Sequence, residues 1–310
     1  MRVVFMGTPE FAATILESLT EKYDVVLVVT QPDKAVGRKQ ILVPSEVKKC
    51  AELKGIPVFQ PKKIKEEYEP VLAAKPDIII TAAFGQFIPK IILDYPKFGC
   101  INVHGSLLPK YRGGAPIQKA IINGESETGI TIMYMAPKMD AGDIILQRSI
   151  PILPTDDNGS MFIKLSILGK ELLHEALPLI IAGTNKKIAQ DESLATYAYN
   201  ISHEEQFIDW NNSAQDVFNH IRGLSPNPTA LSSINGTIIK VYEAKVVETN
   251  LVGKPGEVLS LSKELLVACG KDAISILTLQ VSGKNKMDVK SFLNGQKIVN
   301  VGSVLENNIL

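Results

Sequence analysis

The chain has 310 residues, of which 45% are hydrophobic and 21% charged, and its 33 Lys and Arg balance 33 Asp and Glu. This length predicts one large domain or two unequal ones, and the composition excludes a generally disordered chain. The zero net charge excludes nucleic-acid binding through overall charge, so any polyanion must be recognised by local patches.

Short, nearly continuous apolar runs alternate with helical patterns through the first half of the chain. Such runs are typical of parallel strands that are buried on both faces. Strands are predicted at residues 2–6, 25–30, 77–84 and 99–104. Helices are predicted at residues 10–22, 44–54 and 64–74. Repeated βα units predict an α/β fold, a Rossmann-like doubly wound sheet that binds ligands at the carboxyl ends of its strands.

The middle of the chain predicts two further strands and a long helix. Residues 129–135 and 143–152 are strand-like, and a polar turn at residues 137–142 joins them. An apolar-periodic helix is expected at residues 160–181, with Pro178 bending its last turn.

Composition divides the chain into two domains. A polar stretch predicts a linker at residues 184–206, between a catalytic domain at 1–183 and a C-terminal domain at 207–310. One helix is expected to begin at Ser213 and to end at Gly223. Strands are then predicted at residues 236–242, 256–261, 264–268 and 274–280. Regularly spaced strands after a helix predict a smaller, OB-like β-barrel.

Cysteine spacing and the chain start point to a reducing compartment. Cys50, Cys100 and Cys269 stand far apart without a CxxC motif, which predicts neither a disulfide framework nor a zinc site. The chain opens on a strand, and its apolar stretches are too short to span a bilayer. We expect a cytoplasmic protein with no membrane association.

Two polar residues lie where a predicted strand ends. Asn102 and His104 are two positions apart, so they project from the same face at the crevice side of the sheet. An amide beside an imidazole suits polarising a carbonyl and sharing its developing negative charge. The alternative is that both are buried polar groups that hold the following loop. By contrast, the first βα turn at Gly7 lacks the GxGxxG pattern and does not predict dinucleotide binding.

A second polar cluster supplies a carboxylate. Asp140 and Asp143 lie in the turn between two predicted strands, and either could reach a neighbouring strand end. A carboxylate beside His104 would keep the imidazole protonated. For Asp143 the turn-forming role is the simpler interpretation. No Ser or Cys nucleophile stands at an elbow, so the pattern predicts direct transfer to a nucleophile that the substrate supplies.

These residues lie in a segment that resembles a known family. The stretch from Asn102 to Pro116, NVHGSLLPKYRGGAP, with Asp140 in MDAGD, resembles the formyltransferases that use 10-formyltetrahydrofolate. The resemblance implies that Asn102, His104 and Asp140 are catalytic. Further matches are MGTPEF at 6–11, TQPD at 30–33, FGQFIP at 84–89, APIQ at 115–118 and IDW at 208–210. Together they resemble the branch of the family whose acceptor is methionine esterified to initiator tRNA.

The resemblance also implies where folate binds. The co-substrate, 10-formyltetrahydrofolate, is consumed rather than retained, and no metal is expected. Predicted folate-binding residues are Ser106, Leu107, Leu108 and Pro109, with Phe84, Gly85, Gln86, Phe87 and Ile88. For Phe84 and Phe87 a place in the hydrophobic core is the alternative.

The resemblance places tRNA on basic segments. The loop at residues 32–44 carries Lys34, Arg38 and Lys39, with Arg38 suited to phosphates or base edges. In the C-terminal domain, ten Lys and Arg against nine Asp and Glu leave no strong overall field, and Lys284, Lys286 and Lys290 form the best basic cluster. The alternative for the lysines is a solvated surface.

One segment departs from the family pattern, and several other functions stay open. Residues 226–230, PNPTA, stand where the family carries tryptophans, which argues against aromatic stacking there. A monomer that needs no protein partner is expected. The alternatives are an acceptor such as an amino-sugar nucleotide or glycinamide ribonucleotide, a formyltetrahydrofolate hydrolase, and a non-catalytic RNA-binding protein.

Overall fold

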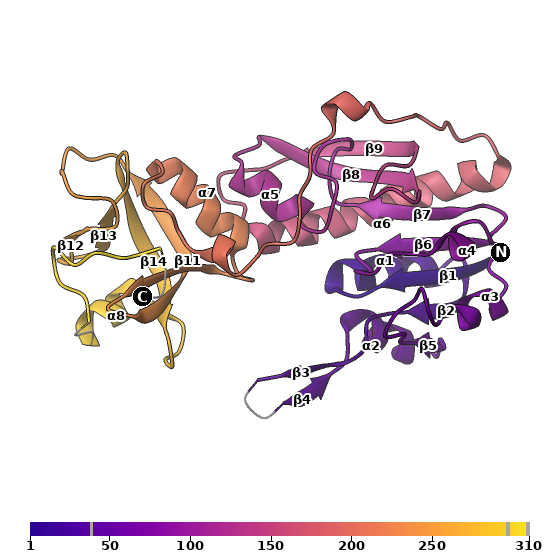
Figure 1. Ribbon diagram of the computed structural model, residues 1–310, viewed down its shortest axis with the longest axis horizontal. Helices are drawn as coiled ribbons and strands as arrows, with labels where there is room; N and C mark the ends of the chain where they lie inside the picture. Colours follow the sequence, from indigo (N-terminus) through magenta and orange to yellow (C-terminus); the bar gives the residue numbers. More distant parts are fainter. Residues whose placement is uncertain (38–39, 296–297, 308–310) are drawn as a thin grey trace. The chain divides into compact units, whose positions relative to one another are not determined.

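The computed structural model describes residues 1–37, 40–295 and 298–307, and these form two compact units (Figure 1). The first unit comprises Met1–Pro116, Glu127–Pro151 and Phe162–Tyr199. The second comprises Ile117–Ser126, Ile152–Met161 and the chain from Asn200 onward. The domain boundaries predicted above stay a prediction, but residues 184–199 of the predicted linker belong to the first unit.

The first unit is built on a seven-stranded sheet, which confirms the predicted α/β class. Its order is β5 (Val58–Phe59), β2 (Asp24–Val29), β1 (Arg2–Gly7), β6 (Ile78–Ala82), β7 (Cys100–His104), β8 (Glu127–Tyr134) and β9 (Ile144–Pro151). The first five strands are parallel, whereas β8 pairs antiparallel with both β7 and β9. The carboxyl ends of β1, β2, β6 and β7 therefore share one edge of the sheet.

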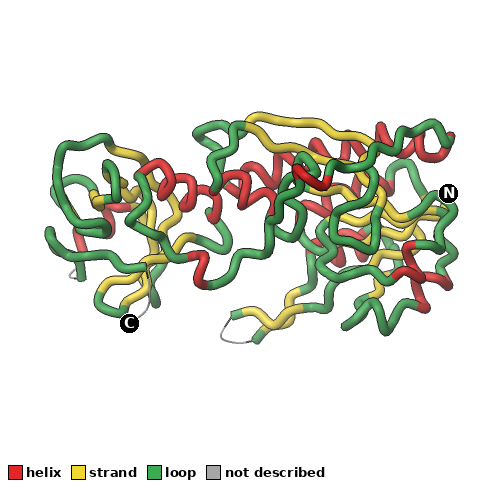
Figure 2. Tube along the Cα trace, turned by 45° about the horizontal axis from the view of Figure 1, so that its top comes forward, coloured by secondary structure: helices red, strands yellow, loops and turns green. Residues whose placement is uncertain are grey.

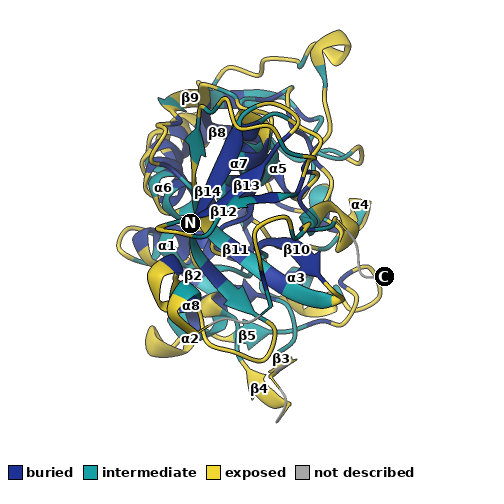
Figure 3. Ribbon diagram, turned by 90° about the vertical axis from the view of Figure 1, so that its left-hand side faces the viewer, coloured by how far each residue is buried: buried dark blue, intermediate teal, exposed yellow. Residues whose placement is uncertain are grey.

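Alternate residues of the central strands pack against helices on opposite faces, as a doubly wound sheet requires. Val4 and Met6 of β1 share a core cluster with Val71 of α3 (Glu69–Ala73) and Ile92 of α4 (Lys90–Leu93). The other face meets α1 (Glu10–Thr20) and α6 (Asn158–Ala182). At Gly169 of α6 an added Cβ would lie within 4 Å of side chains from α1, β7 and β8. Strand β8 is accordingly buried along most of its length, whereas the edge strand β9 is largely intermediate or exposed (Figure 3).

The second unit contains a curled β-sheet, consistent with the predicted barrel. The strand order is β10 (Ala230–Ile234), β11 (Thr237–Val247), β14 (Ala273–Val281), β13 (Leu265–Ala268) and β12 (Val258–Ser260). The short strand β15 (Met287–Asp288) pairs with β14 and leads into α8 (Val289–Gly295). Backbone hydrogen bonds join residues 302–305 to Gly256 and Val258, and join Glu306 to Ser233 of β10. The C-terminal segment thereby links the two edges of the sheet into a ring.

Helix α7 (Ala214–Leu224) begins as predicted but runs past Gly223. Ser213 caps its first turn by accepting a hydrogen bond from the Asp216 backbone N–H. Gly223 is not the terminator that the pattern predicts. Its role is close packing, because an added Cβ would lie 2.6 Å from Ile122 of α5 (Pro116–Ile122).

The predicted loop at residues 32–44 contains a hairpin. Strands β3 (Lys34–Val36) and β4 (Ile41–Val43) pair antiparallel, and α2 (Glu46–Leu53) follows. The base of the hairpin is tied to α2, because Lys48 Nζ contacts Asp33 Oδ2 at 2.8 Å. These strands were not predicted from the sequence, because the apolar residues of β4 are solvent-exposed and do not follow a buried-strand pattern.

Beyond α6 the chain is mostly irregular up to α7 (Figure 2). Only two short 3-10 turns interrupt it, at Glu192–Leu194 and Glu204–Gln206. Its first part runs along the first unit, where Ile188 exchanges backbone hydrogen bonds with Ile144 and Ala198 bonds Arg112. Across the described residues, none of the helices combines the length and hydropathy that crossing a bilayer requires.

Candidate active site

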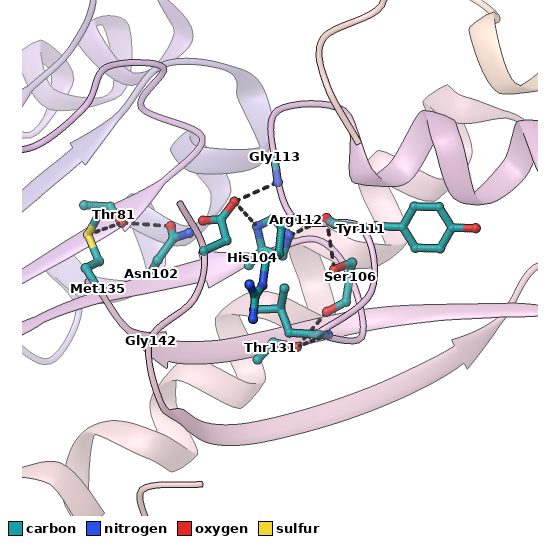
Figure 4. Close-up of polar contacts among 12 residues, drawn as sticks. Thr81, Asn102, His104, Ser106, Tyr111, Arg112, Gly113, Thr131, Met135 and Gly142 are labelled. Atoms are coloured by element: carbon teal, nitrogen blue, oxygen red, sulfur yellow. Dashed lines mark hydrogen bonds and ion pairs between the residues drawn. The ribbon is translucent and has the colours of Figure 1, made fainter. Parts of the chain in front are cut away.

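Strand β7 presents Asn102 and His104 on one face, as its two-residue period predicts. The neighbouring strand β6 fixes the amide, because Thr81 Oγ1 donates to Asn102 Oδ1 at 2.8 Å (Figure 4). Thr81 lies opposite Asn102 in the parallel register and is 2% exposed. Since the amide oxygen accepts this bond, its NH2 group is the end that can donate to a ligand.

The His104 ring is buried between two acceptors. Its Nε2 lies 2.9 Å from the backbone carbonyl oxygen of Tyr111, and its Nδ1 lies 3.7 Å from Asp140 Oδ2 (Figure 4). A carbonyl oxygen only accepts, so Nε2 carries a hydrogen and is occupied within the loop. The Nδ1 side faces the carboxylate without a short hydrogen bond, and this nitrogen is the one positioned to meet a substrate.

Asp140 reaches His104 because its turn is held in an unusual shape. Asp140 has a left-handed backbone, with φ of 46°, a conformation that Asp tolerates better than most residues. Its Oδ2 accepts a hydrogen bond of 2.8 Å from the Gly113 backbone N–H. Gly113 itself must be glycine, since its φ is 123° and an added Cβ would lie 2.6 Å from the Ala198 carbonyl oxygen. The structure thus brings the three predicted catalytic residues together, while the Asp143 side chain makes no hydrogen bond that joins this cluster.

The turn that carries Asp140 is also held by a hydrogen-bond network around Gln190, which the sequence analysis did not predict. Gln190 Nε2 donates to the carbonyl oxygens of Asp140 and Gly142, each at 2.8 Å. Its Oε1 accepts from Arg112 Nε and Nη2 at 3.1 and 2.8 Å. One amide therefore links the loop after His104 to the turn that carries Asp140. No local signal marks Gln190, because it lies about fifty positions away in a polar stretch that resembles a linker.

Arg112 completes this network as a fully buried cation. Its Nη2 lies 2.8 Å from Glu192 Oε1, and Lys138 also pairs with Glu192. Hydrogen bonds from Arg112 and Lys138 lower the pKa of Glu192 to about 2. The same Glu192 hydrogen bond raises the pKa of Arg112. The charge of Arg112 is therefore paired, as the burial of a guanidinium requires.

The loop after β7 is anchored by side chains that bond its backbone groups. Ser106 is fully buried and donates to the Lys110 carbonyl oxygen at 2.7 Å. Thr131 Oγ1 donates to the Ser106 carbonyl and accepts from the Leu108 N–H, and Gln147 donates to the Leu108 carbonyl. Among the predicted folate residues, Ser106 and Leu108 are thus buried and bonded internally, whereas Leu107 and Pro109 are partly accessible. Their folate role stays a prediction.

A second loop follows the carboxyl end of β6. Thr8 and Gln31 both donate to the Phe84 carbonyl oxygen, and Gln86 bonds the Ile64 N–H and the Pro61 carbonyl. Phe84 and Ile88 are buried in the core, but the Phe87 side chain is 67% exposed. The core interpretation therefore holds for Phe84 and is wrong for Phe87. Gly85, whose φ is 84°, turns the chain between them.

The basic residues predicted to bind tRNA lie in both units. Lys34 opens β3 and is exposed, while Arg38 and Lys39 lie outside the described residues. In the second unit Lys284 and Lys286 are exposed in the turn between β14 and β15, and Lys290 is exposed on α8. Lys286 Nζ lies 4.3 Å from the Tyr242 ring centroid, a cation–π contact. Asp288, the one acid between these lysines in the sequence, accepts hydrogen bonds from Ser291 at the start of α8.

The assembled geometry suits stabilising an oxyanion. Asn102 offers an amide donor, His104 presents Nδ1 next to it, and Asp140 places a carboxylate beside the ring. Within the part of the chain that the structure describes, no group of three or more His, Cys, Asp or Glu residues could hold a metal ion.

Comparison with known proteins agrees with this geometry. Residues 1–177 match the family model described as formyl transferase, and residues 200–297 match the model of the formyl transferase C-terminal domain. Two Staphylococcus aureus proteins named methionyl-tRNA formyltransferase, from strains bovine RF122 / ET3-1 and MW2, are each 49% identical over 308 residues. Each match covers 98% of this chain and 99% of the relative.

Solved structures share the fold at low identity. The Helicobacter canadensis N-formyltransferase, solved with folinic acid and dTDP-3-aminofucose, has a TM-score of 0.66 and 21% identity, covering 88% of this chain and 98% of its own. HypX from Aquifex aeolicus, solved with tetrahydrofolic acid, has a TM-score of 0.65 and 20% identity. That match covers 94% of this chain but only 47% of HypX.

Proposed function

The chain belongs to the formyltransferase family, and on this basis we propose that it moves the formyl group of 10-formyltetrahydrofolate to the α-amino group of methionyl initiator tRNA. The observation that carries the proposal is the cluster of Asn102, His104 and Asp140. It lies in a chain that is 49% identical, over 98% of its length, to proteins named for this reaction. The product is formylmethionyl-tRNA, which is used to start translation.

The reaction begins when the neutral α-amino nitrogen attacks the formyl carbon. A new C–N bond forms, and the carbonyl electron pair moves onto the formyl oxygen to give a tetrahedral oxyanion. The NH2 group of Asn102 and the Nδ1–H of His104 hold this oxyanion. Fixed donors of this kind act where charge develops, and losing one typically costs ~10²–10³ in rate.

Collapse of the intermediate breaks the bond between the formyl carbon and the folate nitrogen. The oxyanion re-forms its carbonyl, and the folate nitrogen leaves with a proton. The attacking amine loses a proton, and Asp140, whose carboxylate lies beside the His104 ring, relays it through water. No electrons are gained or lost overall, so no redox partner is required.

The substrates are assigned to two regions. Folate contacts come from Leu107 and Pro109 after β7 and from Gly85 to Phe87 after β6, where side chains are accessible. Acceptor tRNA contacts come from the β3–β4 hairpin, including Lys34, and from Lys284 and Lys286 of the barrel unit. The protein acts as a cytoplasmic monomer.

Other acceptors are less well supported. The sugar N-formyltransferases share the fold but are only 19–21% identical in sequence to this chain. The relatives named methionyl-tRNA formyltransferase are 49% identical over 98% of the chain. The second unit also matches a C-terminal formyltransferase model, so the similarity is not confined to the catalytic sheet.

The test is formyl transfer from 10-formyltetrahydrofolate to methionyl initiator tRNA, with free methionine and uncharged tRNA as controls. Transfer to the charged initiator alone is expected. Formate release without transfer would identify a hydrolase, and no folate consumption would contradict catalysis altogether.

A further inference from the structure

Two exposed tyrosines stack on each other in the segment between α6 and α7. The ring centroids of Tyr197 and Tyr199 lie 5.8 Å apart, and the ring planes differ by only 6°. The two residues are 45% and 64% exposed. Because they are two positions apart in extended chain, both rings project from one side of the segment.

The backbone of this pair is fixed to the loop that carries the candidate active site. Ala198, between the two tyrosines, donates to the Arg112 carbonyl at 2.7 Å and accepts from the Ala115 N–H at 3.0 Å. The carbonyl oxygen of Thr196, the residue before Tyr197, accepts a hydrogen bond from the Arg112 N–H at 2.9 Å. The pair is therefore held in register with the loop.

The backbone of the pair contacts the loop that holds the Asp140 carboxylate. The Ala198 carbonyl packs directly on Gly113, where an added Cβ would approach it to 2.6 Å. Gly113 is the residue whose N–H holds the Asp140 carboxylate. In addition, Tyr197 forms a parallel backbone bridge with Arg112. A short chain of contacts thus connects the stacked rings to the catalytic cluster.

The proposed acceptor, methionyl-tRNA, brings its 3′-terminal nucleotide next to the candidate active site. In an aminoacyl-tRNA only Cα and the carbonyl carbon separate the α-amino nitrogen from the ester oxygen on the last ribose. When that nitrogen reaches the formyl carbon, the unpaired 3′ end must lie beside the site. Aromatic rings bind such single-stranded bases by stacking, because every base has a π face.

We propose that Tyr197 and Tyr199 form a stacking surface for the unpaired 3′-terminal bases of the acceptor tRNA. This inference rests on the proposed function and names the protein surface that orients the end of its substrate. Two parallel rings present an outer face on which a third ring can continue the stack. Stacking is tolerant of base identity, so this surface orients the tail of the tRNA without reading its sequence.

The test is the variant Tyr199→Ala, with Tyr199→Phe as the matched control that keeps the ring. Tyr199 is chosen because its side chain is the more exposed, and because Tyr197 also contacts Arg112. We expect Tyr199→Ala to raise the KM for methionyl-tRNA about 5-fold or more, which is the lower bound that base–aromatic stacking implies. Tyr199→Phe should retain the wild-type KM, and tetrahydrofolate binding should be unchanged in both.

A direct readout uses methionyl initiator tRNA with 2-aminopurine as its last base, bound without folate. Stacking quenches this fluorophore, so wild type and Tyr199→Phe should quench it and Tyr199→Ala should quench it less. Absent quenching by the wild type, or an unchanged KM in Tyr199→Ala, overturns the inference. If the wild type formylates no methionyl-tRNA, the proposed function fails first and this inference fails with it.

Discussion

The proposed catalytic cluster and the basic surfaces proposed to bind tRNA are built in opposite ways. His104 is 5% exposed, and each of its ring nitrogens faces an acceptor, one from the following loop and one from a distant turn. Lys34, Lys284 and Lys286 are exposed, and Lys286 is held by a ring face rather than by a carboxylate.

This difference follows from the two tasks. A transition-state donor must already point at the developing charge, so it has to be fixed by neighbours before the substrate arrives. A lysine that binds phosphate neutralises diffuse charge and works over a range of positions. Substitutions in the cluster should therefore change turnover strongly, and substitutions on the basic surfaces should change binding weakly and with salt.

The largest effect is expected for the cluster itself. His104→Ala and Asp140→Asn should each lower kcat by ~10²–10³, because the first removes a proposed oxyanion donor and the second removes the carboxylate proposed to support His104 and relay the proton. Asn at position 140 retains the size and left-handed tolerance of Asp, so the turn should still form. Asp143→Asn is the matched control in the same turn and should keep wild-type kcat. Near-normal turnover of His104→Ala would show that the assigned site is wrong.

A smaller effect on kcat is expected for Gln190, which holds the turn that carries Asp140. Gln190→Glu keeps an acceptor for Arg112 but replaces the NH2 donor that binds the carbonyls of Asp140 and Gly142. We expect kcat to fall about 10-fold, as for other residues that orient a catalytic group, with the KM for folate unchanged. Gln206→Glu, which removes a comparable donor to a carbonyl away from the site, should have no effect on kcat. A KM change with constant kcat would instead assign Gln190 to substrate binding.

Binding effects should be weaker still on the barrel surface. Replacing Lys284 and Lys286 by Ala should raise the KM for methionyl-tRNA a few-fold and leave kcat constant. The salt dependence of binding should also decrease by about one unit of log–log slope per lost phosphate contact. The control is Lys263→Ala, an exposed lysine in the turn between β12 and β13. An equal effect of Lys263→Ala would show that the cluster has no special role.

The smallest effect concerns stability against pH. Hydrogen bonds from Arg112 and Lys138 lower the pKa of Glu192 to about 2 in the folded protein, below the ordinary glutamate value of 4.5. The stabilisation is therefore present above pH 4.5 and is lost as the pH falls towards 2. Denaturant titrations of wild type and Glu192→Gln should differ most near neutrality, and the difference should shrink on acidification. A difference that grows as the pH falls contradicts this assignment.

Much of the sheet was predictable because its signals are local. The apolar runs around Val4, Ile80 and Val103 lie in strands, and Asn102 and His104 share a face because strand side chains alternate. The hairpin at β3 and β4 and the helix α5 were not predicted. Exposed strand residues and a proline-rich loop hide the ordinary hydrophobic pattern there.

The residue chemistry and spacing in the sequence predicted the α/β class and the barrel class, and the resemblance to the formyltransferases singled out the three candidate catalytic residues. Only the tertiary structure decided what holds them: Thr81 for Asn102, Gly113 for Asp140, and Gln190 behind both loops. It also separated Phe84 from Phe87, two residues of one motif with opposite burial. The physical reason is the distance along the sequence over which each interaction acts. Strand alternation is set between adjacent residues, whereas a hydrogen bond between segments dozens of positions apart exists only after the chain has folded.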